Sequence, residues 1–236
     1  IDTISMHETL EQVESAIINK KQVHHTVVNA GKIVLMQTDK ELEKSVIEAD
    51  IINVDGQAVV WAANLLGHKV PERVSGIDLM TELIKLSFRN RYKCFFFGAT
   101  EEVVVKLVDL YKKKYSEDII AGYRNGYFDA EDEDSIAEEI AESGADILFV
   151  AITSPKKEIF LKRYKYKLKK LGLIMGVGGS FDVISGKVKR APIWMQDFGL
   201  EWLYRVIQEP KRMWKRYLIG NSKFIWLVFN EFFKSK

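Results

Sequence analysis

The chain has little of what identifies secreted or membrane-spanning proteins. Its only cysteine, Cys94, sits in the apolar run 94–97, where a small buried hydrophobe is the expected role. A single cysteine excludes a disulfide framework and favours a reducing, cytosolic compartment. No apolar run approaches the roughly 20 residues that a helix needs to cross a bilayer. The longest candidate, 224–233, is broken by Asn230 and Glu231, so it suits a membrane surface and not its interior.

The chain also lacks a strong overall charge. Its formal net charge is +2 over 236 residues, so a nucleic-acid role would need positive charge gathered in one place. It gathers near the C-terminus, where cations of the 205–223 segment interleave with aromatic residues and meet one acid, Glu209. This pattern favours an anionic membrane surface, with a packed core or a stacking platform for single-stranded nucleic acid as alternatives. No basic groove continues elsewhere, so the sequence predicts no nucleic-acid partner.

Apolar runs alternate with segments of helical periodicity along most of the chain. Such an alternation predicts an α/β fold with a Rossmann-like parallel sheet flanked by helices. The predicted strands are 23–29, 50–54, 93–98, 118–122, 146–152 and 172–177, and the predicted helices are 41–49, 57–66, 77–88, 101–115, 135–142 and 155–169. Beyond Gly186 the chain becomes basic and helical. We therefore predict a core of residues 1–194 and a C-terminal helical appendage of residues 195–236.

Ligands of open parallel sheets bind beyond the carboxyl ends of the strands, which directs attention to the turns there. Asp55 ends one predicted strand and precedes Gly56. Its carboxylate could take a proton from a sugar hydroxyl, or it could cap the helix that starts near Gln57; position alone favours the cap. Arg73 and Asp78 could form a phosphate clamp with its supporting acid, although pattern alone favours a surface ion pair.

Three apparent signals are discounted. The glycines of segment 176–179 are wrongly spaced for a dinucleotide fingerprint, which disfavours a dehydrogenase, although exposed N–H groups there suit phosphate. The Asp-x-Asp pattern of 132–134 fits a helix start, where acids favour the dipole. His24 and His25 are adjacent in a strand and point to opposite faces, so they cannot share a metal. No metal site and no cofactor are predicted.

Motifs spread over nearly the whole chain together resemble the WecG/TagA/CpsF glycosyltransferases. The matching positions are Asn29 with segment 33–39, segments 49–56, 71–79, 126–128, 154–158, 176–182, 188–192 and 199–205, and Glu209-Pro210. The resemblance implies an inverting, metal-independent transferase on the cytoplasmic face of the plasma membrane. It would move a sugar, N-acetylmannosamine in some branches, from a UDP donor to an undecaprenyl-diphosphate-linked sugar. Whether the protein forms a homo-oligomer is left open by the sequence.

The resemblance also implies roles for individual residues. Asp55 would be the general base, ahead of the capping role, while Asn29 and Arg73 line the sugar pocket. The expected donor and nucleotide contacts are Gly98, Tyr127, Lys157, Gly178, Gly179 and Asp182. The expected contacts with the lipid diphosphate are Arg205, Arg212 and Arg216.

Lys157 departs from the family pattern, which usually has an amide at this position. A cation there could favour an acidic donor sugar such as a uronate. Two other function classes remain as alternatives to the transferase: a non-catalytic lipid- or nucleic-acid-binding module, and a nucleotide-dependent oxidoreductase.

Overall fold

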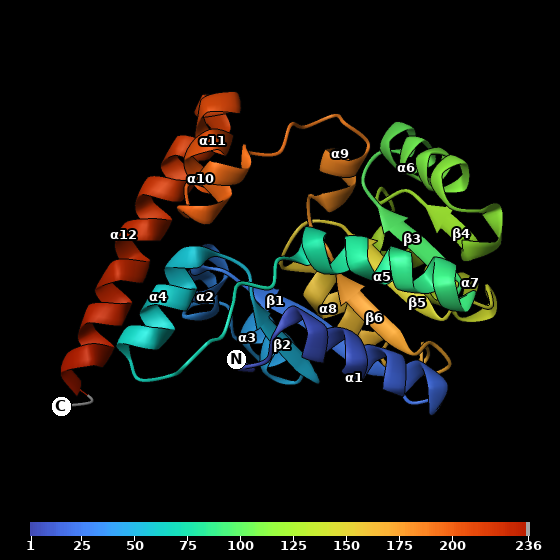
Figure 1. Cartoon of the computed structure of the whole chain (residues 1–236), viewed down its shortest axis with the longest axis horizontal. Coiled ribbons are helices and arrows are strands. Elements are labelled where there is room, and N and C mark those ends of the chain that lie inside the picture. Colours follow the sequence, from blue (N-terminus) through green and yellow to red (C-terminus); the bar gives the residue numbers. More distant parts are fainter. Residues whose placement is uncertain (235–236) are drawn as a thin grey trace.

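A six-stranded, fully parallel sheet forms the centre of the molecule (Figure 1). The computed structural model describes residues 1–234, without the side chains of residues 212, 213, 215 and 216. The strand order is β2-β1-β6-β5-β3-β4. The strands are β1 (Val23–Val28), β2 (Ile51–Val54), β3 (Cys94–Gly98), β4 (Ile120–Arg124), β5 (Ile147–Ala151) and β6 (Leu173–Gly176). All six predicted strands are present, and the predicted fold class is confirmed.

Helices cover both faces of the sheet because the strand side chains alternate between two apolar layers. Phe96 of β3 packs toward α1, α5, α6 and α9, whereas Phe95 and Phe97 pack toward α7 and α8. The helices that follow β1 to β6 are α2 (Ala30–Met36), α3 (Lys40–Ile47), α4 (Gln57–Leu65), α5 (Gly76–Asn90), α6 (Glu101–Lys114), α7 (Glu133–Glu142), α8 (Lys156–Arg163) and α9 (Ser180–Ile184). Two short 3-10 turns, η1 (Glu117–Ile119) and η2 (Ala130–Asp132), precede β4 and α7.

Helix α1 (Met6–Ile18) was not predicted, although its start is encoded locally. Ser5 caps it and forms a capping box with Glu8. Val13 is fully buried against the layer that contains α5. The helix starts predicted after Thr100 and around Asp132 are confirmed, since α6 begins at Glu101 and α7 at Glu133.

Three helices follow the Rossmann-like part of the chain: α10 (Ile193–Asp197), α11 (Glu201–Gln208) and α12 (Pro210–Lys234). The predicted boundary after residue 194 falls inside α10. Helix α12 lies along α2 and α4, beside the β2 edge of the sheet (Figure 1). Phe224 anchors it, being 6% exposed in a cluster with Val54 and Val60.

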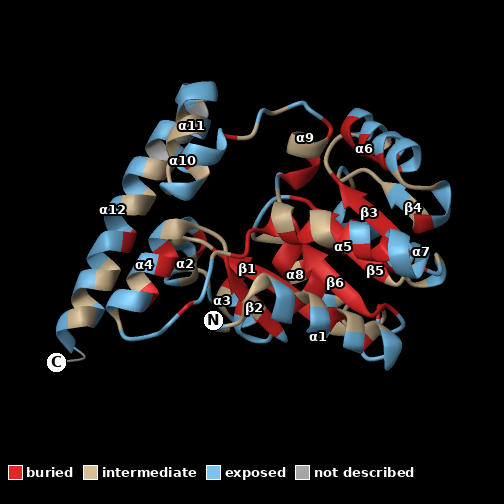
Figure 2. Cartoon of the chain, in the orientation of Figure 1, coloured by how far each residue is buried: buried red, intermediate tan, exposed pale blue. Residues whose placement is uncertain are grey.

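Burial is highest in the sheet and lowest along the C-terminal helices (Figure 2). Most of α11 and α12 is exposed or half-buried, including several large apolar side chains. Among the described residues, no helix is both long and apolar enough to cross a membrane.

Candidate functional site

The carboxyl ends of β1 and β2 bring Asn29 and Asp55 together. The strands pair with Val28 opposite Val54, and the Asp55 N–H donates to the Val28 carbonyl over 2.8 Å. The Asn29 side chain accepts from the Lys32 N–H and caps α2. Gly56 follows with φ +137°, and a Cβ there would lie 3.7 Å from Asn29 Cβ. The positive φ favours glycine, so the chain can turn directly behind Asp55.

The Asp55 side chain is not the cap that position alone favours. Gly56 is the N-cap of α4, and no side chain caps that helix. Among the described residues, no donor makes a hydrogen bond to the half-buried Asp55 carboxylate. The capping interpretation is therefore wrong, because the sharp turn at Gly56 directs the chain into α4 without using the carboxylate.

Burial raises the pKa of Asp55, and the neighbouring charges do not cancel this effect. The cations Arg73, Arg205 and Lys32 act against it, while Glu201 adds to it. A carboxylate with a raised pKa and no hydrogen-bond donor is a stronger proton acceptor than an ordinary one. The site can therefore accept a proton at Asp55.

Arg73 is held by an acid that the sequence did not single out. Its Nη1 lies 2.7 Å from Glu201 Oε2, and its side chain is only 15% exposed. Asp78 is instead bound in bidentate fashion by Arg190, over 2.6 and 2.8 Å, and lies 3.9 Å from Arg73. The ion pair expected between Arg73 and Asp78 is therefore present, but it is partly buried, and Glu201 is the closer acid because the chain folds α11 back over Arg73. No local spacing signals a contact across 128 residues.

The remaining predicted turns follow the same edge of the sheet. Gly178, with φ +53°, and Gly179 follow β6, which lies between β1 and β5. Neither glycine has an atom within 4 Å of where a Cβ would be. Asp182, one turn into α9, is 3.4 Å from Lys187. This turn presents open backbone between the Asp55 region and the ends of β5 and β3.

At the end of β3, Gly98 has φ +134°, and a Cβ there would overlap the Ala151 backbone. Gly126 packs against Gly98 and places Tyr127, which is 74% exposed, at the same turn. The close backbone approach requires glycine at both positions. The turn therefore presents an exposed aromatic ring above the carboxyl ends of β3 and β5.

Lys157 belongs to a buried trio behind these turns. Its Nζ lies 2.6 Å from Glu158 Oε1, and Lys32 Nζ lies 2.8 Å from the same oxygen. Lys32 also donates to the Val27 carbonyl. Burial alone would raise the pKa of Glu158, but the two ammonium groups outweigh it and hold the pKa at about 2. A Cβ on Gly176 would lie 3.1 Å from Lys157 Cε, so the lysine packs directly under the β6 turn.

Of the three predicted arginines of the C-terminal helices, Arg205 lies on α11 beside a small cleft that Arg190 and Glu201 also line. Arg212 and Arg216 lie outside the residues whose side chains the structure describes. Their predicted role stays a prediction.

The comparison with known proteins decides the family. The family model of the glycosyl transferase WecG/TagA/CpsF family matches residues 1–236. The chain belongs to this family. The recognition made from the motifs is thereby confirmed.

Two curated relatives of this WecG/TagA/CpsF member are each named N-acetylglucosaminyldiphosphoundecaprenol N-acetyl-beta-D-mannosaminyltransferase. The protein from Bacillus spizizenii is 38% identical over 170 residues, which are 72% of this chain and 65% of the relative. The protein from Bacillus subtilis is 36% identical over 180 residues, which are 76% of this chain and 69% of the relative. The matched part thus spans about two thirds of each relative's length.

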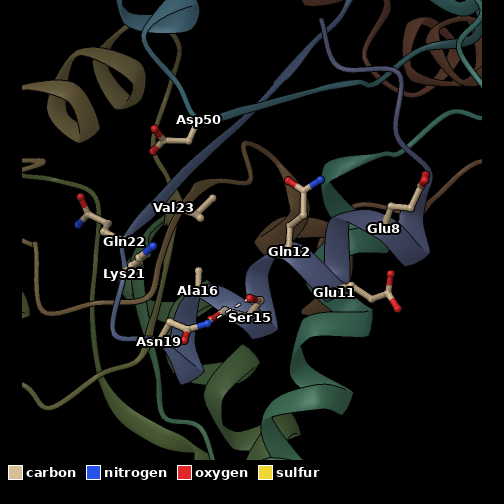
Figure 3. Close-up of a pocket in the computed structure, with 10 residues that line it drawn as sticks. All are labelled: Glu8, Glu11, Gln12, Ser15, Ala16, Asn19, Lys21, Gln22, Val23 and Asp50. Atoms are coloured by element: carbon tan, nitrogen blue, oxygen red, sulfur yellow. Dashed lines mark hydrogen bonds between the residues drawn. The ribbon is translucent and has the colours of Figure 1, made fainter.

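A larger hollow in this family member lies away from Asp55. It measures about 610 Å³ and is lined by polar residues of α1, such as Glu8 and Glu11, and by Asp50 (Figure 3). Val23 and Asp50 stand at the starts of β1 and β2, so the hollow faces the amino ends of the strands. Its position at the opposite end of these strands separates it from the residues that gather around Asp55.

Two of the four histidines, His24 and His25, and the cysteine of this family member are buried in the core. His24 is 1% exposed and His25 is fully buried, and burial lowers the pKa of each to about 4. His25 Nε2 contacts Asn53 Oδ1 at 2.8 Å. Burial raises the pKa of the Cys94 thiol to about 12, as expected for a small hydrophobe. Within the described residues, no three His, Cys, Asp or Glu side chains gather as metal ligands.

Proposed function

We propose that this protein transfers N-acetylmannosamine, or a related sugar, from a UDP-sugar to an undecaprenyl-diphosphate-linked sugar. The observation that carries the proposal is the free Asp55 carboxylate at the carboxyl edge of the sheet, with Arg73, Arg205 and Lys32 around it. Cations around a proton acceptor suit a reaction that deprotonates an alcohol beside a phosphorylated leaving group. The relatives' names support the same sugar and the same class of acceptor.

In the proposed reaction, the acceptor hydroxyl attacks the anomeric carbon from the face opposite the UDP group. Asp55 takes the hydroxyl proton, the new glycosidic bond forms as the bond to UDP breaks, and the anomeric configuration inverts in one displacement. No covalent sugar–enzyme intermediate is required. The raised pKa of Asp55 suits this role, because a more basic carboxylate drives the proton transfer more strongly.

The departing UDP carries negative charge that must be stabilised. The open backbone at Gly178 and Gly179 and the cations Arg73 and Arg205 are the groups that we propose for this task. They would replace a divalent ion, so we propose a metal-independent reaction. Gly98, Tyr127 and Asp182 border the same edge and are the proposed nucleotide contacts, with the exposed Tyr127 ring suited to stacking on a base.

We further propose that α12 seats the protein on an anionic membrane surface. Trp214, Trp226, Phe229 and Phe233 are each more than half exposed, and Lys211, Arg212 and Lys223 lie in the same helix. Exposed aromatic rings beside cations favour the headgroup region of a bilayer. A lipid-linked acceptor would then be delivered to α11, which contacts α12 and carries Arg205, one of the cations that act on Asp55.

The transfer is tested by incubating the full chain with a panel of UDP-sugars, uronates included, and a prenyl-diphosphate-linked N-acetylglucosamine. We expect a disaccharide product with inverted anomeric configuration, formed equally well with a chelator present. A uronate as best donor would match the buried positive charge of Lys157 and Lys32. Absence of turnover with every donor would reject the transferase function and favour the alternative, a non-catalytic binding module.

Membrane seating is tested by cosedimentation with phosphatidylglycerol vesicles. The double variant W226S/F229S should bind about tenfold or more weakly, because two aromatic side chains no longer enter the interface. Tyr166→Ser removes a ring outside α12 that is more exposed than Trp226 or Phe229, and this variant should bind like the parent. Equal binding by all three proteins would reject α12 as the contact surface.

A further inference from the structure

Four charged side chains join the C-terminal helices to the Asp55 region. Glu201 of α11 lies 2.7 Å from Arg73 Nη1 and 3.6 Å from Arg190 Nε. Arg190 in turn binds Asp78, which lies 3.9 Å from Arg73. All four side chains are at most 38% exposed, so water screens them less than surface pairs. The Glu201 carboxylate is thus shared between two arginines that come from different loops.

Helix α11 also directs two opposite charges toward Asp55. Glu201 and Arg205 are four residues apart, so they share a face of the helix. Asp55 is faced by these two, by Arg73 from the turn before α5 and by Lys32 from α2. Arg73 has the strongest influence of these charges on Asp55, and Glu201 is the only acid among them. Docking of α11 therefore supplies the acid closest to Arg73, since Asp78 lies 3.9 Å from Arg73 and is bound by Arg190.

We propose that Glu201 is a positioning residue that holds the Arg73 guanidinium away from the Asp55 carboxylate while α11 is docked, keeping Asp55 a free base. The inference rests on the proposed transferase function. An arginine beside a carboxylate forms a strong bidentate pair when no other acid competes for it. Such a pair would stabilise the ionised form of Asp55 and make it a weaker base. Glu201 prevents this pairing and leaves Arg73 in place for an anionic substrate group.

The test compares Glu201→Gln with Asp197→Asn in the full chain. Asp197 is an exposed acid on the neighbouring helix α10, so the control loses the same charge without touching Arg73. The first measurement is the ¹³C-carboxyl titration of Asp55, assigned by its loss in Asp55→Asn. E201Q should move the Asp55 midpoint to lower pH, because the charge that raises its pKa is gone. D197N should leave the midpoint where it is.

The second measurement is the pH dependence of kcat/KM. The acid limb should move to lower pH in E201Q, kcat should fall roughly tenfold or more, and KM for the UDP-sugar should not rise. E201D keeps the charge on a side chain one methylene shorter, so it should shift the midpoint in the same direction but less. If E201Q does not fold, E201D alone decides the question.

Two outcomes would overturn the proposal: an Asp55 midpoint in the Glu201 variants that matches D197N, or a raised KM with an unmoved acid limb. The latter would mark Glu201 as a merely structural contact. Failure of the transferase assignment is separate, because the carboxyl titration needs no turnover. A parent protein that is inactive with every donor would reject the function and leave the titration to decide about Glu201.

Discussion

At the residue scale, one carboxylate compensates two buried cations. Glu158 is 2% exposed and pairs with Lys32 and Lys157, so the trio keeps a net positive charge beneath the β6 turn. Such an arrangement costs desolvation energy that apolar side chains of similar volume would avoid. Its position under the open backbone of Gly178 is consistent with an anionic donor.

The trio gives the first prediction. Glu158→Gln should lower the free energy of unfolding by about 3–5 kcal/mol, because two buried ammonium groups lose the carboxylate that they share. Glu82→Gln breaks an exposed pair with Lys85 and should cost about 1 kcal/mol or less. Urea unfolding of both variants measures the difference. Equal losses would show that the trio is not the buried network described.

The sequence predicted single site residues better than their partners. Asp55 and Asn29 follow from strand ends, since any residue behind a parallel strand reaches the same edge. The partner of Arg73 did not follow, because Glu201 is brought in by the path of the chain between α9 and α11. Likewise, the sequence placed a cation at Lys157 but gave no sign that it shares the Glu158 carboxylate with Lys32.

At the element scale, α12 has one buried anchor among the side chains that the structure describes. Phe224 is 6% exposed between α12 and the cluster with Val59, Val60 and Ala63 of α4, whereas Phe229 is 60% exposed. Most helical stability in proteins comes from the tertiary packing of an apolar face. Among the described side chains of α12, Phe224 therefore contributes most to the stability of the helix against local unfolding.

The second prediction follows from that anchor. Phe224→Ala should weaken the docking of α12 by about 3 kcal/mol and accelerate tryptic cleavage in residues 211–223, where lysines and arginines concentrate. Phe229→Ala removes the same side chain from an exposed position and should be cleaved at the parent rate. Equal cleavage of both variants would contradict the anchoring role of Phe224.

Periodicity located most elements because burial on both sheet faces leaves unbroken apolar runs, as in β3 and β5. It missed α1, although Met6, Leu10 and Ile17 pack beside the buried Val13 at helical spacing. Polar and charged residues separate these positions, and the stripe that they form was not recognised. The strand order could not be predicted from the sequence. The last strand of the chain, β6, lies between β1 and β5, and no local pattern indicates this position.

At the scale of the whole molecule, acid should destabilise the fold before its carboxylates are protonated. His24 and His25 have folded pKa values of about 4 against 6.5 when unfolded, so the unfolded state binds more protons between these values. Their contribution is complete above about pH 6.5 and is lost as the pH falls toward 4. Glu158 has a folded pKa of about 2 against 4.5 when unfolded, so the stability that it contributes is lost only as the pH falls below about 4.5.

The third prediction is a decline in the free energy of unfolding from pH 7 to pH 4.5, with His25→Gln reducing the slope by about half. Each histidine contributes on the order of 3 kcal/mol over its full range. His7→Gln removes an exposed imidazole and should leave the slope unchanged. A slope that His25→Gln does not alter would show that His25 titrates similarly in both states.

The transferase account depends on Asp55 as the base, and the most direct test is the turnover of Asp55→Asn with a UDP-sugar and a lipid-linked acceptor, alongside its affinity for UDP. We predict a kcat lower by about 10²- to 10⁴-fold, because the amide cannot take the hydroxyl proton. The Kd for UDP should stay within about threefold, since the cations and the Gly178 turn are untouched. A kcat within a few-fold of the parent would contradict the account.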